Sequence, residues 1–179
     1  RPVLRGVENM GHVYKGFLYC GLMVSESGEA RVLEFNCRLG DPETQLLMLL
    51  MKGDFLPLLE NACRDDEFSL SEVSTEFWHQ KAGLCVVASA KGYPGEVLKG
   101  DAIEVGRQIE DDPSIKVFHS GTETLNGNLI TDGGRVLTIS GIGENKDALR
   151  NKVYEKMSQI KFDGKHYRND IGLTEIREK

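Results

Sequence analysis

The sequence has no long apolar run and no visible signal peptide, and both absences argue against a membrane protein. The longest uninterrupted apolar stretch, Leu46–Met51, is far shorter than the roughly 20 residues that a membrane-spanning helix needs. Cysteine pairs are also absent, because the four cysteines are widely spaced and no C-x-x-C motif exists. Neither a zinc site nor a redox motif is therefore indicated. Four free thiols are typical of a reducing cytoplasm, where we expect the protein to reside.

Runs of like charge are missing as well. The chain has 22 Lys and Arg against 28 Asp and Glu, which gives a formal net charge of -6. A general nucleic-acid binder needs clustered basic residues to neutralise phosphates, so we expect no nucleic-acid partner. What is present is ordinary for a globular protein: 40% hydrophobic and 28% charged residues over 179 positions, enough for one large domain or two small ones.

The first part of the chain predicts a β-hairpin. Residues 16–24 (GFLYCGLMV) have the composition of a buried strand, and residues 30–37 that of a second strand after a polar turn with a glycine. Side chains alternate between the two faces of a strand. Glu34, Asn36 and Arg38 are therefore expected on one face, opposite the apolar face.

Two helices are predicted after this hairpin. Asp41 can cap the first helix, and Pro42 suits its first position, because the N–H group that proline lacks would have no partner there. The following Leu46–Met51 is apolar all round, which predicts a buried helix. Asp54 can cap a second short helix that ends near Arg64.

The composition changes in the second half of the chain. Residues 65–80 are polar and acidic, which indicates a linker. Short strand-like runs then follow, separated by glycine-containing turns. The runs are 84–90, 117–119 and 135–140, and the turns are 92–95, 126–128 and 132–134. Asn145 can cap a last helix, in which Leu149, Val153, Met157 and Ile160 form an apolar stripe.

The segment 33–45 (LEFNCRLGDPETQ) carries the candidate chemistry. Glu34 and Asn36 lie about 7 Å apart along one strand face and offer a carboxylate and an amide oxygen, which suit Mg²⁺ or Mn²⁺ rather than zinc. Arg38 adds a cation that can grip a phosphate or carboxylate through two hydrogen bonds. The helix start at residues 41–43 adds backbone N–H groups. From these residues alone, an ordinary solvated strand face remains the alternative.

The whole segment resembles the signature of the phosphoribosylamine–glycine ligase family of ATP-grasp ligases, with Leu39 where Phe is more usual. Further segments are similar to that family in the right order: GFLYCGLMV, KGYPGEVLKGD, VFHSGT, TDGGRVL and YRNDIG. The resemblance implies an α+β fold. Residues 1–64 would be the C-terminal half of an ATP-grasp domain, an antiparallel sheet with helices that carries the metal site. Residues 65–80 would be a linker, and residues 81–179 a small C-terminal α+β domain.

The resemblance also implies an ATP-dependent carbon–nitrogen ligase of purine biosynthesis. ATP would phosphorylate glycine, and the amine of 5-phosphoribosylamine would attack the glycyl phosphate, giving glycinamide ribonucleotide, ADP and phosphate. Glu34 and Asn36 match the metal-ligand positions for Mg²⁺ or Mn²⁺. Arg38 would be the catalytic residue that stabilises the transferred phosphoryl group. Asp41, Pro42 and Glu43 would bind substrate.

The family also has an N-terminal substrate domain and a lid-like nucleotide domain. We expect both upstream of Arg1, because this sequence contains no glycine-rich phosphate loop, and we expect the chain alone to be inactive. Two alternatives stay open. The chain could belong to another ATP-grasp carboxylate–amine ligase or carboxylase, or it could be a non-catalytic fragment that acts as a scaffold or subunit contact.

Three further features allow two interpretations each. The GYPG sequence at 92–95 is typical of a turn, or it could be a loop that faces the phosphoribosyl group. His119 has no second His or Cys nearby, so a structural role is favoured over a site role. Arg168 and Asp170 could form a structural ion pair or belong to a site.

Overall fold

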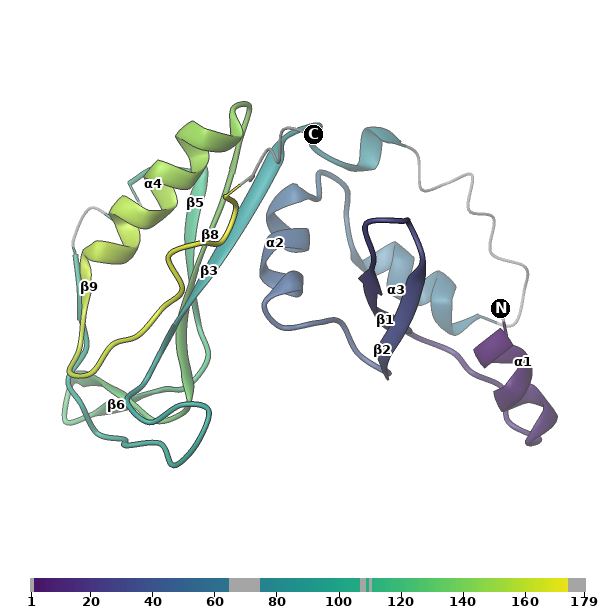
Figure 1. The fold of residues 1–179 in the computed structure, drawn as a ribbon, viewed down its shortest axis with the longest axis horizontal. Helices are drawn as coiled ribbons and strands as arrows, with labels where there is room; N and C mark the ends of the chain where they lie inside the picture. The colour runs from purple at the N-terminus through teal and green to yellow at the C-terminus, as the bar shows by residue number, and fades with distance from the viewer. Residues whose placement is uncertain (1, 65–74, 107–108, 110, 174–179) are drawn as a thin grey trace. The chain divides into compact units, whose positions relative to one another are not determined.

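The computed structural model describes residues 2–64, 75–106, 109 and 111–173. Helices and antiparallel strands make up the structure, which confirms the α+β class (Figure 1). The chain divides into two compact units. The N-terminal unit comprises residues 1–41 and 52–78, and the C-terminal unit comprises residues 42–51 and 79–179.

This division differs from the expected domains in one place. Residues 42–51 group with the C-terminal unit rather than with the hairpin that precedes them. Within the expected linker, residues 65–74 lie outside the described residues, and Thr75–Phe77 form a short 3-10 helix. The domain boundaries themselves stay a prediction.

The N-terminal unit contains the predicted hairpin. Strand β1 (Tyr19–Val24) pairs with β2 (Ala30–Asn36) in antiparallel register, with an irregularity after Gly21. Helices α1 (Pro2–Asn9) and α3 (Leu56–Cys63) complete the unit. The prediction that Asp54 caps α3 is wrong, because Phe55 occupies the N-cap position and its side chain makes no capping hydrogen bond. The Asp54 Oδ1 instead accepts a hydrogen bond of 2.9 Å from the Leu56 backbone N–H, from one position before the cap.

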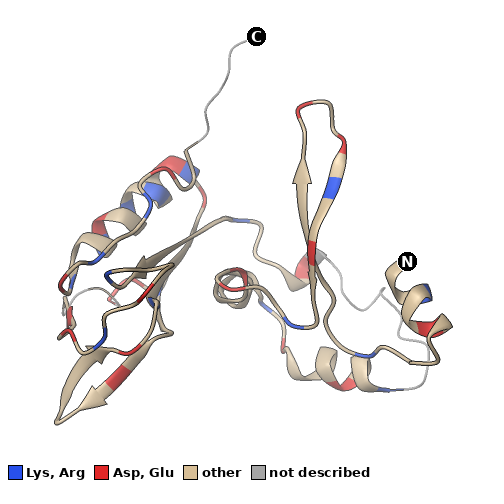
Figure 2. Ribbon diagram, turned by 60° about the horizontal axis from the view of Figure 1, so that its bottom comes forward, with Lys and Arg blue, Asp and Glu red and all other residues tan. Residues whose placement is uncertain are grey.

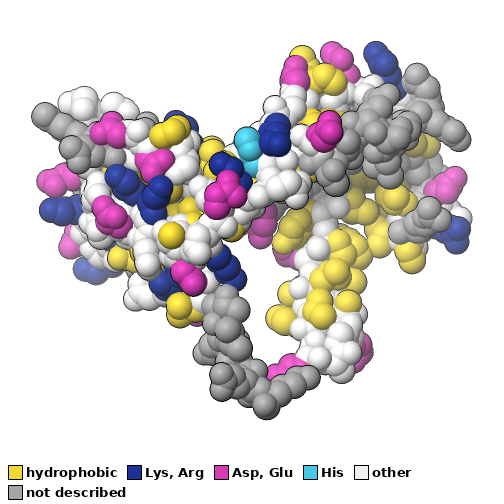
Figure 3. All heavy atoms as spheres, turned by 90° about the horizontal axis from the view of Figure 1, so that it is seen from above, with side chains coloured by type: hydrophobic (Ala, Val, Ile, Leu, Met, Phe, Trp, Pro, Cys, Tyr) yellow, Lys and Arg dark blue, Asp and Glu magenta, His cyan; other side chains and the backbone are white. Residues whose placement is uncertain are grey.

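The hairpin is far more exposed than its sequence predicts. Leu33 and Phe35 of β2 are 64% and 44% exposed, although both are apolar. Figure 3 shows apolar side chains gathered on the surface of this unit. A ribbon of two strands cannot bury both of its faces by itself, so an apolar pattern alone does not ensure burial.

The core lies in the C-terminal unit, in a three-stranded sheet with the order β3-β8-β5. These strands are β3 (Ala82–Ser89), β8 (Arg135–Gly143) and β5 (Ile115–His119), and all pairings are antiparallel. They contain the predicted runs at 84–90, 117–119 and 135–140, except that β3 ends at Ser89, one residue before the end of its run. Strand β8 stands in the middle of this sheet, and most of its residues are buried.

Helices α2 (Glu43–Leu50) and α4 (Lys146–Ser158) cover opposite faces of this sheet. Gly83 faces α2, because an added Cβ would lie 2.6 Å from a Leu46 methyl group, whereas a Cβ on Gly141 would meet Leu149 and Val153 of α4. Gly141 pairs with Leu84, the residue after Gly83. Successive residues of a strand point to opposite faces, so the two glycines lie on opposite faces of the sheet. Each glycine allows one helix to approach the strands closely (Figure 1).

Helix α4 confirms its sequence prediction except at Ile160, which is buried but lies beyond the end of the helix, in strand β9 (Ile160–Lys161). The Asn145 side chain accepts a hydrogen bond from the Ala148 N–H at 2.9 Å, and Leu149, Val153 and Met157 are buried. Acidic and basic residues are interspersed along its outer face (Figure 2).

This unit also contains two smaller strand pairs. Strands β4 (Glu104–Val105) and β9 (Ile160–Lys161) pair with each other, and β6 (Thr122–Leu125) pairs with β7 (Asn128–Thr131). The turn between β6 and β7 is Asn126-Gly127, and both residues have positive φ, as a tight hairpin turn requires.

Helix α2 differs from the prediction in two ways. It begins at Glu43, and Pro42 occupies the N-cap position without a side-chain hydrogen bond, so the prediction that Asp41 caps this helix is wrong. Proline has no side-chain acceptor for the first N–H groups of the helix. The helix is also half-buried rather than fully buried. A helix that lies on one sheet face covers only one side of itself.

No helix among the described residues is long and apolar enough to cross a membrane. The four cysteines are free thiols, as the sequence predicts: Cys20, Cys37 and Cys63 are exposed, and Cys85 is half-buried.

Candidate functional site

The predicted metal ligands Glu34 and Asn36 lie side by side on β2. The Asn36 Nδ2 donates a hydrogen bond of 3.0 Å to the Glu34 Oε1, so both side chains project from the same face of the strand. Glu34 is exposed and Asn36 is half-buried, so neither is enclosed by apolar groups. The prediction that the two residues share one accessible face is confirmed.

Gly21 makes room for this pair from the neighbouring strand. It lies directly across from Glu34 in the register of the hairpin, and it is itself buried. A Cβ at this position would stand 3.1 Å from the Glu34 Cγ, closer than side-chain carbons normally approach. The position on β1 that faces Glu34 therefore holds no side chain, and this lets the carboxylate lie across the ribbon.

The pair fits a small divalent cation. Carboxylate and amide oxygens are the donors that such ions prefer, and the Asn36 amide nitrogen lies 3.0 Å from the Glu34 carboxylate because it donates a hydrogen bond to it. A half-turn of the amide would present its oxygen in place of its nitrogen. The described residues contain no cluster of three or more His, Cys, Asp and Glu that could hold a metal. Mg²⁺ commonly completes such a shell with water and substrate phosphates.

The other predicted site residues follow this strand. Arg38 is exposed, and its Nη1 donates a hydrogen bond of 3.0 Å to the Leu39 carbonyl. Asp41 is the last residue of the first segment of the N-terminal unit. Pro42 and Glu43 belong to the C-terminal unit, at the start of α2. The roles of Arg38, Asp41, Pro42 and Glu43 stay predictions.

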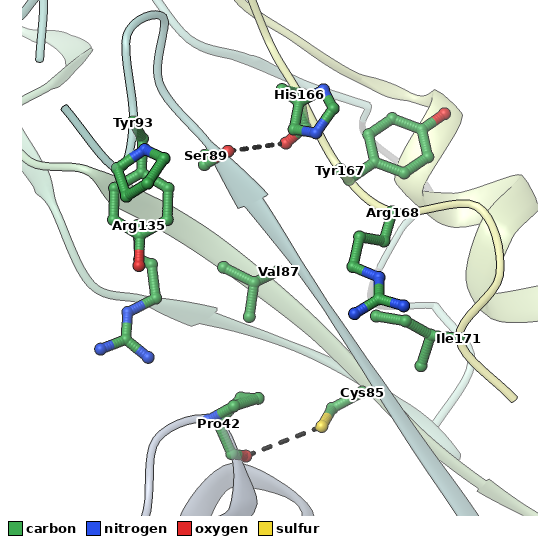
Figure 4. Close-up of a pocket in the computed structure, with 11 residues that line it drawn as sticks. Pro42, Cys85, Val87, Ser89, Tyr93, Arg135, His166, Tyr167, Arg168 and Ile171 are labelled. Atoms are coloured by element: carbon green, nitrogen blue, oxygen red, sulfur yellow. Dashed lines mark hydrogen bonds between the residues drawn. The ribbon is translucent and has the colours of Figure 1, made fainter.

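A pocket of about 360 Å³ lies in the C-terminal unit and joins several of the sequence segments singled out above. Its lining comes from β3, the 92–95 loop, the start of β8, the segment 166–171 and the turn before α2. The lining residues are Pro42, Cys85, Val87, Ser89, Tyr93, Pro94, Arg135, His166, Tyr167, Arg168 and Ile171. Figure 4 shows Tyr93 and Arg135 on one side of Val87, and Arg168 and Ile171 on the other.

The floor of this pocket is the part of the sheet face that α2 leaves open. The floor residues Cys85, Val87 and Ser89 are alternate residues of β3. They therefore lie on the same face of the sheet as Gly83, against which α2 packs. The Cys85 thiol donates a hydrogen bond to the Pro42 carbonyl at 3.7 Å, which places the start of α2 at the edge of the floor.

The Gly92–Gly95 loop is fixed against the start of β8. The Ala90 N–H donates to the Gly134 carbonyl at 2.8 Å, and the ring of Tyr93 covers Gly134 so closely that an added Cβ would stand 2.4 Å from it. Gly92 itself has φ +92 and cannot carry a side chain, because its Cβ would meet the Glu96 carbonyl. This wall is therefore rigidly built: Gly134 of the TDGGR segment leaves room for the Tyr93 ring, whereas Gly133 packs against Gly121.

The opposite wall is an irregular segment that α4 and β3 hold in place. His166 exchanges backbone hydrogen bonds with Ser89 at 2.8 and 3.0 Å. Farther along, the Tyr154 hydroxyl donates to the Arg168 carbonyl at 2.7 Å, and the Arg150 Nε donates to the Ile171 carbonyl at 3.1 Å. Two side chains of α4 thus position a segment that has no regular secondary structure.

The charged groups of the pocket are basic. Arg135, His166 and Arg168 line it, and no acidic side chain does. The Arg168 guanidinium donates two hydrogen bonds to Asp170, at 2.9 and 2.6 Å, which confirms the predicted pair. Hydrogen bonding to Arg168 lowers the pKa of Asp170, and the same contact raises the pKa of Arg168. Both side chains remain exposed, so Arg168 stays accessible to an anion.

Sequence reasoning missed Arg135 and His166 as pocket residues. Arg135 follows two glycines in what the sequence shows only as a turn, and its place at the pocket depends on the pairing of β8 with β3. His119 lies elsewhere: its Nδ1 shares a hydrogen bond of 3.0 Å with the Thr122 hydroxyl, which favours the structural interpretation.

The comparisons with known proteins agree with these features. Residues 1–44 match the family model described as phosphoribosylglycinamide synthetase, ATP-grasp (A) domain, so the strand that carries Glu34 and Asn36 lies in an ATP-grasp segment. Residues 83–174 match the model described as phosphoribosylglycinamide synthetase, C domain. The chain therefore belongs to the phosphoribosylglycinamide synthetase family.

Individual relatives give the same result. The chain is 41% identical over 175 residues to a phosphoribosylamine–glycine ligase of Vibrio vulnificus, covering 98% of this chain and 40% of that protein. It is 41% identical over 179 residues to the corresponding ligase of Escherichia coli K12, covering 99% and 41%. The crystal structure of phosphoribosylamine–glycine ligase from Thermotoga maritima superposes with a TM-score of 0.75 at 35% identity, covering 93% of this chain and 39% of that one. The chain thus spans about two fifths of the length of these relatives.

Proposed function

We propose that the full-length protein carrying this chain joins glycine to 5-phosphoribosylamine at the expense of ATP, in the cytoplasm. The glycine carboxylate attacks the γ-phosphorus of ATP and releases ADP. The amine of phosphoribosylamine then attacks the acyl carbon of glycyl phosphate, releasing phosphate and forming glycinamide ribonucleotide. The observation that carries this proposal is the Glu34–Asn36 pair on an accessible strand face, in a chain of this family.

Glu34 and Asn36 are the proposed ligands of Mg²⁺ or Mn²⁺. Such an ion would offset the negative charge of the phosphates when bound. Glu34 contributes the charged ligand and Asn36 the neutral one, and the hydrogen bond between their side chains keeps them adjacent on one face of β2.

Arg38 is proposed to stabilise the transferred phosphoryl group. It lies two residues beyond Asn36 and is exposed, so its guanidinium can exchange its bond to the Leu39 carbonyl for bonds to phosphate oxygens. Asp41, Pro42 and Glu43 are proposed to line the substrate side.

The test is a pair of alanine variants in the full-length protein. Glu34→Ala should lower turnover by orders of magnitude, because a charged metal ligand contributes several kcal/mol of stabilisation to the charge of phosphoryl transfer. Glu29→Ala is the matched control, since Glu29 is an exposed carboxylate of the same hairpin that pairs with Arg31. ADP release in the presence of glycine and phosphoribosylamine measures both.

Near-normal turnover of Glu34→Ala would rule out the metal role. Rapid ADP release with bicarbonate and no amino acid would instead favour the carboxylase alternative. A full-length protein without any ATP turnover would favour the scaffold alternative.

A further inference from the structure

We propose that the pocket of the C-terminal unit binds the 5-phosphoribosyl group, with Arg135 and Arg168 as its phosphate-binding residues. The inference rests on the proposed function for the identity of the ligand, but the pocket itself is defined by its own geometry. It assigns a role to the GYPG, TDGGR and HYRND segments, which the metal pair on β2 leaves unexplained.

The charge of the lining selects an anion. The protein as a whole carries a formal charge of -6, yet the side chains that line this pocket include two arginines and a histidine and no carboxylate. Arginine presents a planar fork of donors that matches two phosphate oxygens at once. Asp170 neutralises part of the Arg168 charge and holds its guanidinium in a fixed orientation. Arg168 can therefore engage a phosphate with little loss of side-chain entropy.

The lining combines apolar and polar groups, as recognition of a sugar phosphate requires. About 360 Å³ is at the small end of ligand pockets. Val87 and Ile171 supply an apolar surface for the carbon face of a ribose, and the Tyr93 and Ser89 hydroxyl groups lie among the lining residues for its hydroxyls (Figure 4).

Two buried hydroxyl groups flank the floor. Thr138 and Ser140 of β8 pair with Val87 and Cys85, so they share the floor's face of the sheet. Both are fully buried, and neither hydroxyl oxygen has a hydrogen-bond partner among the described residues. Buried polar groups are nearly always satisfied, so buried water is the expected partner of both hydroxyls, neither of which lines the pocket.

The walls are fixed before any ligand arrives. Tyr93 is seated on Gly134, and the backbone of residues 166–171 is held by Arg150, Tyr154 and Ser89. The Lys165 ammonium also fixes this segment, because it donates a hydrogen bond of 2.9 Å to the Met157 carbonyl at the end of α4. Such pre-organisation is typical of a binding site and is unnecessary for a simple connecting loop.

Binding of ribose 5-phosphate to the 179-residue chain tests the proposal without requiring turnover. Isothermal titration should show binding of ribose 5-phosphate, weaker binding of inorganic phosphate, and no binding of ribose. Arg135→Gln and Arg168→Gln should each weaken binding by about tenfold or more, as the loss of a charged hydrogen bond predicts. Lys116→Gln is the matched control, because Lys116 is an exposed cation of the same sheet that does not line the pocket.

The two proposals can fail separately. Absence of ribose 5-phosphate binding, or equal affinity in wild type and both arginine variants, overturns the pocket assignment. Equal affinity for inorganic phosphate and ribose 5-phosphate overturns its sugar-binding part. In the full-length protein, Arg168→Gln should raise the KM for phosphoribosylamine by about tenfold and leave the KM for ATP unchanged. A wild-type protein that binds ribose 5-phosphate but forms no amide would refute the proposed function alone.

Discussion

At the scale of single residues, Gly21 controls the geometry of the metal pair without touching a ligand itself. Gly21→Val should displace the Glu34 side chain, because even a Cβ at this position stands 3.1 Å from the Glu34 Cγ. We expect the Mg²⁺ concentration for half-maximal turnover to rise several-fold, since sub-ångström displacements of a site residue are costly. Gly6→Val is the control, as a Cβ there meets nothing within 4 Å. An unchanged metal requirement would show that Glu34 lies elsewhere when it binds the ion.

Single residues were predictable from sequence where a local rule decides their place. Alternation along a strand put Glu34 and Asn36 on one face, and the structure agrees. The capping role of Asp41 was wrong, because the helix begins one residue later than the local signal suggests. Arg135 could not be found at all, since its neighbours in the pocket come from segments more than 30 residues away in the chain.

At the scale of elements, one ion pair links the turn before β5 to α4. The Asp112 carboxylate accepts a hydrogen bond of 2.7 Å from Lys152 and two further bonds from Ser114. Hydrogen bonding by Lys152, and then by Ser114, lowers the pKa of Asp112. A depressed carboxyl pKa contributes stability that is present above the unfolded-state pKa of about 4 and is lost as the pH falls below it.

Asp112→Asn should therefore destabilise the protein near pH 7 and have a shrinking effect below about pH 4. We expect a loss of about 1 kcal/mol in unfolding free energy at neutral pH, because Lys152 is partly exposed and solvent weakens the pair. Urea denaturation at several pH values measures the difference. Asp111→Asn is the control, a neighbouring exposed carboxylate. A pH-independent difference would assign the effect to packing instead of charge.

Elements with their own local signals were predicted well. The hairpin of β1 and β2, the Asn145 cap and the Asn126-Gly127 turn each rest on chemistry within a few residues. The burial of α2 was not predictable, because an apolar helix is fully covered only if other elements surround it. The pairing of β4 with β9 was also missed, since each has two residues and they are more than 50 positions apart.

At the scale of the whole molecule, the proposed ligase should discriminate against amino acids larger than glycine. Pro42 borders the pocket that we assign to phosphoribosylamine, and its ring restricts the backbone at the proposed glycine side. Alanine would have to displace this turn. Overpacking typically costs about 1–3 kcal/mol, or roughly ten- to two-hundred-fold in specificity. ADP release by the full-length protein with glycine and alanine measures the ratio, and equal rates would contradict the role of the turn.

The exposed thiol of Cys20 in the hairpin provides a labelling position for spectroscopy. Cys20 of β1 pairs with Phe35, one position from the Gly21–Glu34 pair, so its thiol projects from the face of the ribbon opposite to the metal ligands. It is exposed and therefore open to thiol-specific reagents. With Cys37 and Cys63 replaced by serine, a fluorescent or spin label on Cys20 would stand directly behind Glu34. Paramagnetic Mn²⁺ arriving on the far side would quench or broaden its signal, so ion occupancy could be followed in solution without altering either ligand.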